Sequence, residues 1–169
     1  MNSEAAPAPA HEPRLNRELR ALLASQRVAA LGTLNSTGQA FVSMVPFAMA
    51  QDGGALVIHV SQLAPHTANL LAEPTVSVMV MQAEVAGQPV HALPRVSFDA
   101  VASRLARDSA PWHAARDAYL ARFPEAEPMT ALGDFSFVML RVTQARHVAG
   151  FGAARSLAPD DLASVLKPL

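Results

Sequence analysis

The sequence contains no cysteine, which excludes disulfide bonds, thiolate metal sites and a cysteine nucleophile. It has no apolar run approaching the ~20 residues that a membrane-spanning helix needs. Its N-terminus also lacks the basic segment and apolar core of a secretory signal. Together these absences predict a cytoplasmic protein.

Net charge is also nearly absent, because 13 Lys and Arg residues stand against 14 Asp and Glu residues. A chain with this balance has no electrostatic footprint for a nucleic acid or an anionic membrane surface, so we expect neither as a partner. A small-molecule substrate is expected instead. With 169 residues and 51% hydrophobic residues, the chain suits one globular domain with a substantial core.

Several catalytic and metal-binding motifs are missing as well. There is no G-x-S-x-G elbow, P-loop or G-x-G-x-x-G run, and no catalytic acid or base stands out. His59, His91, His113 and His147 are scattered without an H-x-x-x-H pair, so no dedicated metal site is predicted. Haem iron needs only one axial imidazole, and any of these histidines is a candidate for that role.

The patterns that are present predict an α+β fold. Residues 1–13 are rich in alanine and proline and read as a disordered tail, so residues 14–169 form the single domain. Alternating or β-branched runs separated by Gly-containing turns predict six antiparallel strands, which we expect to form a small barrel with flanking helices. The strands are expected at 27–34, 39–50, 55–60, 75–82, 94–105 and 134–146, and the helices at 14–25, after 65, from Ser109 to Phe123 and at 156–166.

Pro46 interrupts the second predicted strand. Because proline cannot donate to a β-ladder, it marks either a sheet edge or a bulge. Such a break also lets a flat ring approach the backbone.

Residues 61–71 (SQLAPHTANLL) form a junction between an apolar strand and a short helix. A strand-to-helix junction collects free backbone N–H groups at the positive end of a helix dipole, which suits a phosphate. The same residues also suit an ordinary capped helix with His66 at a wet surface. Spacing alone leaves both interpretations open.

A family resemblance narrows this choice. The segments G32-T-L, G38-QAFVSMVPFA, S61-QLAPHTANL, R95-VSF, D134-F and G150-F-G occur in an order that resembles the pyridoxamine 5′-phosphate oxidase-like, FMN-binding split-barrel superfamily. The L-A-x-H-T-x-N-L run and the late G-F-G are similar to its haem-utilisation branch. Many relatives have glycine near Ala100, so strand five is expected to bend less here.

The resemblance implies a six-stranded split barrel that forms a homodimer, with FMN in clefts lined by both subunits. It implies that backbone at Ser43, Met44, Val45 and Pro46 faces the flavin ring. Ser61, His66, Thr67 and Asn69 would hold the phosphate and ribityl chain, Arg95 would lie near the flavin or phosphate, and Phe151 and Gly152 would close the cleft.

Three functions follow from the resemblance. The first is an FMN-dependent oxidoreductase, in which the flavin carries the redox chemistry. The second is a haem-binding or haem-degrading protein with haem in the same cleft, and the third is a flavin-binding dimer without turnover.

Overall fold

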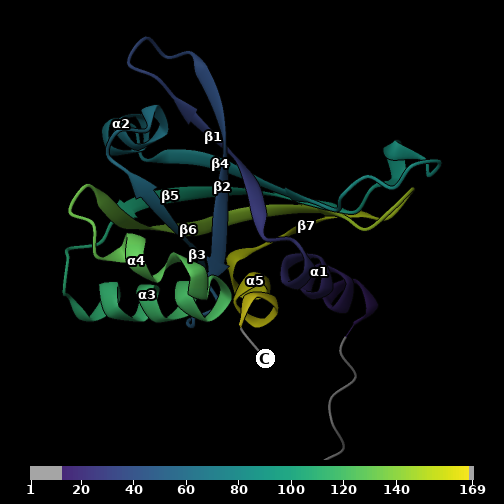
Figure 1. Ribbon diagram of the computed structural model, residues 1–169. Coiled ribbons are helices and arrows are strands. Elements are labelled where there is room, and N and C mark those ends of the chain that lie inside the picture. Colours follow the sequence, from purple (N-terminus) through teal and green to yellow (C-terminus); the bar gives the residue numbers. More distant parts are fainter. Residues whose placement is uncertain (1–12, 168–169) are drawn as a thin grey trace, which may run out of the picture.

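A computed structural model describes residues 13–167 (Figure 1). The predicted tail lies, apart from Pro13, outside the described residues. The elements in chain order are α1 (Arg14–Ser25), β1 (Val28–Leu34), β2 (Ala40–Met49), β3 (Ala55–Ser61), α2 (Pro65–Ala72), β4 (Thr75–Met81), η1 (Val90–Ala92), β5 (Arg95–Arg104), α3 (Ala110–Arg122), η2 (Pro124–Ala126), α4 (Glu127–Thr130), β6 (Phe135–Val148), β7 (Ala154–Leu157) and α5 (Pro159–Leu166).

The sheet is antiparallel in the order β3-β2-β1-β4-β5-β6-β7, and a further pairing of β3 with β6 closes six of these strands into a barrel. The six predicted strands are all present, which confirms the α+β class. The count of six is too low, because β7 forms where we expected a loop and the start of the last helix. β7 pairs with the far end of β6, Ala145–Val148, beyond the part that pairs with β3.

The barrel is incompletely closed on one side of β2. Residues 40–46 of β2 pair with β1, and residues 47–49 pair with β3. Pro46 stands where the two pairings meet, so the side of residues 40–46 that faces away from β1 is an open strand edge. Proline lacks the N–H that a continued ladder would need.

Two hydrophobic clusters hold the fold together. The first fills the barrel and includes Phe47, Phe98 and Leu140, with α1 and α5 packed against it. The second lies between the sheet and α3, around Trp112 and Phe137. Strand β6 supplies both clusters, because its alternate residues face opposite sides, as its two apolar faces predict. No helix within residues 13–167 is long and apolar enough to cross a bilayer.

Local sequence signals explain several boundaries. Gly38, with φ of +78°, donates its N–H to the Asn35 carbonyl in the β1–β2 turn. The Ser109 side chain caps α3 by accepting the Trp112 N–H. The pairing of β5 with β6 has a β-bulge, in which Thr143 of β6 is the extra residue between the Asp99–Gln144 and Ala100–Val142 pairs. The expectation that strand five bends less than in related sequences stays a prediction.

Candidate cofactor site

The junction after β3 is held by hydrogen bonds within the chain. Ser61 Oγ accepts the Leu63 N–H at 3.2 Å and donates to Asp134 Oδ2 at 3.3 Å. The Gln62 N–H also donates to the Asp134 carbonyl at 2.7 Å. Asp134 directly precedes β6, whose first residue pairs with Ser61, and this long-range pairing brings the carboxylate to the junction.

Two more of the predicted phosphate ligands are engaged inside the protein. Thr67 is buried, and its hydroxyl donates to the Ser61 carbonyl at 2.6 Å. Asn69 Nδ2 donates to Thr33 Oγ1 at 3.0 Å, which ties α2 to β1. The N-cap of α2 is Ala64, so no side chain caps this helix. Several donors that the sequence assigns to a phosphate therefore stabilise the junction itself.

His66 in the first turn of α2 contacts Ser43 of β2, with 3.1 Å between Nδ1 and Oγ. Partial burial lowers the pKa of the His66 imidazole below its ordinary value. The ring is therefore mainly neutral at pH 7. The structure brings Ser43 and His66 together, as the resemblance implies, but as a neutral hydrogen-bonded pair.

The strand beside His66 presents its backbone at an open edge. Phe47 donates its N–H to the Arg27 carbonyl, on the side of β1. In an antiparallel strand, successive residues direct their N–H groups to opposite sides, so those of Val42 and Met44 face away from β1. No described strand pairs with this side of residues 40–46. Backbone donors at the edge of β2 are therefore available to a ligand.

The local charge is less favourable to a phosphate than the sequence implies. Residues 61–71 contain no Lys or Arg, and Asp134 adds a carboxylate beside Ser61. Arg104 and Arg107 line a neighbouring cavity of about 210 Å³ with Gln62. Arg107 already donates to the carbonyls of α4 and the turn after it, at 3.2–3.3 Å.

The remaining predicted site residues lie elsewhere in the same chain. Ser43, Leu31, Val78 and Phe98 are successive partners across β2, β1, β4 and β5. Arg95 is therefore three strands from Ser43, roughly 14 Å across the sheet, and three residues or ~10 Å further along β5. It donates to the Leu93 carbonyl at 3.0 Å.

Phe151 and Gly152 are more distant from the junction, in the β6–β7 hairpin beyond the Arg95–Val148 pair. Phe151 is 92% exposed. In Figure 1, α2 lies at the left of the sheet and this hairpin at its right. One chain therefore presents two groups of predicted site residues, at opposite ends of the sheet.

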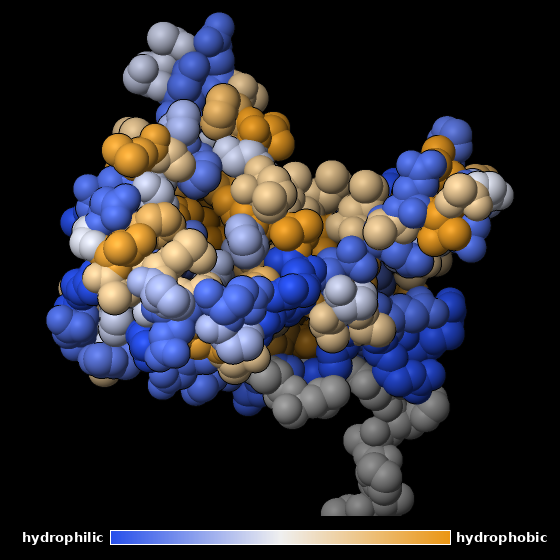
Figure 2. Space-filling model, in the orientation of Figure 1, coloured by the Kyte–Doolittle hydropathy of each residue, from blue (hydrophilic) through white to orange (hydrophobic). Residues whose placement is uncertain are grey.

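An apolar outer face lies between these two groups. Neighbouring strands place Met44, Ala30, Met79 and Ser97 in one row and Val42, Gly32, Ser77 and Asp99 in the next. Met44 and Val42 are 66% and 67% exposed. Figure 2 shows hydrophobic side chains gathered over α2, the β1–β2 hairpin and the strands below them. Exposed large apolar side chains that gather on one face are typical of an interaction surface.

The other described histidines occupy different surroundings. His59 is buried against Phe135 and Phe137, with ring centroids at 5.0 and 4.4 Å, and burial with the nearby Arg107 charge lowers its pKa to about 4. His147 is 1% exposed, whereas His91 and His113 are exposed. No three His, Asp or Glu side chains in residues 13–167 are grouped as metal ligands.

A cavity of about 580 Å³, separate from this site, lies among α1, α3 and α5. Arg27 and Arg122 are among its lining residues. Arg27 pairs with Glu125 at 2.6 Å, and Arg122 donates to carbonyls at the end of α1, including Leu23 at 2.8 Å. These two arginines therefore hold the helices together.

The fold defines an antiparallel split-barrel protein. The pyridoxamine 5′-phosphate oxidase family model matches residues 15–149, so the chain belongs to this family. It is 34% identical over 150 residues to the heme oxygenase HutZ of Vibrio cholerae, covering 88% of this chain and 84% of HutZ.

Two further relatives are longer than this chain. The non-canonical heme oxygenase HOZ of Arabidopsis thaliana chloroplasts is 31% identical over 153 residues, which cover 86% of this chain and 45% of HOZ. The structure of a heme binding protein from Mycobacterium smegmatis superposes with a TM-score of 0.79 at 33% identity, covering 92% of this chain and 62% of that one. The chain thus spans under two thirds of both proteins.

Proposed function

We propose that this protein binds haem as a homodimer and takes part in haem degradation. The observation that carries the proposal is the 34% identity to HutZ, which extends over most of both chains. Bound haem would supply the oxygen chemistry, and the protein would orient the macrocycle and exclude water from it.

The residues around the β2 edge fit such a group. A porphyrin needs apolar contacts, which Val42 and the nearly fully exposed Leu63 provide. Its iron needs a neutral imidazole, and His66 and His91 lie near the two ends of the exposed face. Arg95 provides a cation for a propionate carboxylate.

The dimer is proposed because one chain presents two half-sites. A two-fold axis through the outer face would place α2 of one subunit beside the β6–β7 hairpin of its partner, since an isologous interface uses the same patch on both chains. Arg95 and Phe151 would then complete the site around His66 from the opposite subunit.

Absorbance spectroscopy of the purified protein tests this proposal. Titration with haem is expected to shift the Soret band with saturation at one haem per subunit. Loss of the shift in His66→Ala or His91→Ala, with His113→Ala unchanged, would identify the ligand. His113 is a matched control because it is exposed on α3. The absence of a saturable shift at micromolar haem would contradict the proposal.

The second candidate is an FMN-binding oxidoreductase, which the open backbone edge at Val42 and Met44 favours. Flavin rings accept backbone hydrogen bonds, whereas the crowded junction offers the phosphate few donors. A yellow protein that binds added FMN and is reduced by NADH under anaerobic conditions would support it. Flavin binding without reduction would favour the dimer without turnover.

A further inference from the structure

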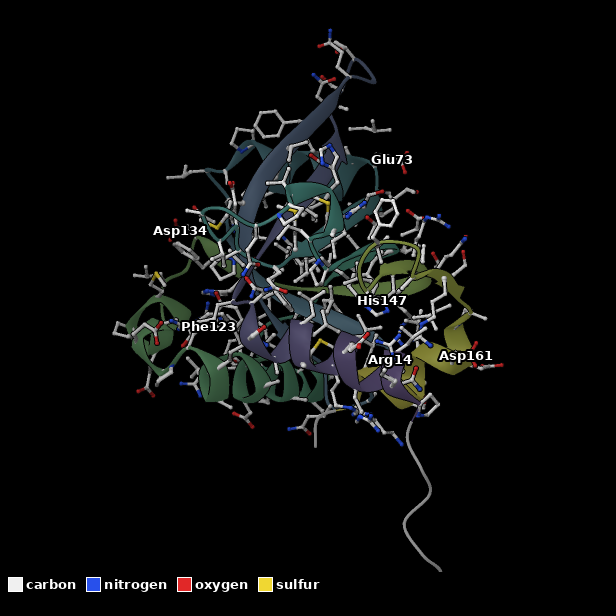
Figure 3. The ribbon with its side chains drawn as sticks, turned by 90° about the vertical axis from the view of Figure 1, so that its right-hand side faces the viewer. Arg14, Glu73, Phe123, Asp134, His147 and Asp161 are labelled. Atoms are coloured by element: carbon white, nitrogen blue, oxygen red, sulfur yellow. The ribbon has the colours of Figure 1, made fainter. Side chains whose placement is uncertain are left out.

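Four charged or titratable side chains from different elements influence one another between α1, α5 and the β6–β7 hairpin. His147 of β6 and Arg155 of β7 are directly opposed partners. Glu18 of α1 acts electrostatically on both, and Asp161 of α5 acts on Arg155. Figure 3 shows His147 and Asp161 on the same side of the molecule, beside the ribbons of α1 and α5.

Most of this cluster lacks hydrogen bonds. Among residues 13–167, the buried atoms without a partner include both ring nitrogens of His147, Nε and Nη2 of Arg155, and Oε2 of Glu18. Glu18 Oε1 accepts from Arg14 at 2.6 Å. Buried polar groups are normally paired, so these atoms have lost contact with water without a hydrogen bond in exchange.

The cluster is balanced only while His147 is neutral. Arg14 and Arg155 then offset Glu18 and Asp161. On the neighbouring strand β5, the partner of His147 is the buried Val96, which brings no charge, while Arg146 beside it on β6 is exposed. A proton on His147 would place a buried cation beside the half-buried Arg155.

We propose that this cluster is an acid-sensitive latch, in which protonation of His147 releases β7 and α5 from α1 and β6. β7 has four residues and pairs with β6 alone, and α5 has eight residues, so both can separate while the β3–β6 pairing stays closed. Their release would expose Leu157, Leu162, Val165 and Leu166, which are buried in the barrel cluster. The released state is therefore a minor opening of the folded protein that acid makes more frequent.

The direction of the effect follows from the environment of His147. Burial, and then the charge of Arg155, lower the pKa of the His147 imidazole, while Glu18 opposes them. The released state has an ordinary imidazole pKa of about 6.5, so it binds protons first as the pH falls. Acid therefore favours release, beginning near pH 6.5.

Hydrogen exchange of the full chain, followed by mass spectrometry and corrected for intrinsic rates, tests the latch. Between pH 7.5 and 5.5, opening of residues 154–166 is expected to increase by up to about tenfold. His147→Phe should remove this increase, because phenylalanine fills the space without titrating. His113→Phe should behave like the wild type.

Two results would overturn the latch: exchange of residues 154–166 that does not change with pH, or the same increase in His147→Phe. Two further measurements test the latch even if His147→Phe does not fold. Arg155→Gln should reduce the increase, since it removes the cation beside the imidazole. A His147 proton resonance in the folded wild type should titrate below pH 6.5, and titration at or above that value would refute the proposal.

Discussion

Met44→Ala is expected to weaken the proposed dimer strongly. Met44 is 66% exposed in the single chain and lies on the apolar outer face, beside Ala30. Complete burial of a methionine side chain contributes about 1.5–3 kcal/mol, so burial of the exposed two thirds contributes about 1–2 kcal/mol. Because an isologous interface contains the residue twice, the dimer loses about 2–4 kcal/mol.

This loss corresponds to a dimer dissociation constant raised roughly 30- to 700-fold. Sedimentation velocity over a range of protein concentrations measures the change directly. Met129→Ala is the matched control, since Met129 is 40% exposed on α4, which packs against β6. A wild-type protein that remains monomeric at high concentration, or a Met44→Ala dimer as tight as wild type, would refute the reasoning.

Three further changes test other parts of the structure. Asn69→Ala removes the 3.0 Å hydrogen bond to Thr33 and should lower the free energy of unfolding, measured by urea titration, by about 1–2 kcal/mol. The same substitution should have a smaller effect in a Thr33→Val variant, which already lacks this hydrogen bond. Ser109→Ala removes the side-chain cap of α3 and should lower the free energy of unfolding by about 1 kcal/mol in the same assay. An unchanged free energy of unfolding would show that this cap does not stabilise the protein. If FMN binds at His66, its affinity should weaken as the pH rises through the lowered His66 pKa and stay constant at higher pH. His66→Gln should bind FMN at all pH values with the affinity that the wild type has at high pH. A wild-type affinity that does not change with pH would show that the charge of His66 does not contribute to FMN binding.

Ser43 and His66, which the resemblance assigns to one site, contact each other although they are 23 positions apart. Their role in binding a cofactor stays a prediction. The sequence could not predict that His66 and Arg95 lie at opposite ends of the sheet, because strand order and register depend on pairings between distant segments. Asp134 was missed as a neighbour of Ser61 for the same reason, since only the β3–β6 pairing brings them together.

The sequence by itself determined the local elements, because alternation, caps and turn glycines act within a few residues. It also determined the family, through motifs such as the H-T-x-N run. Only the tertiary structure decided how the barrel closes, where β7 adds to β6, and that Thr67 and Asn69 bond inward. It also decided the burial of His147 beside Arg155, because burial depends on which distant elements pack over a side chain.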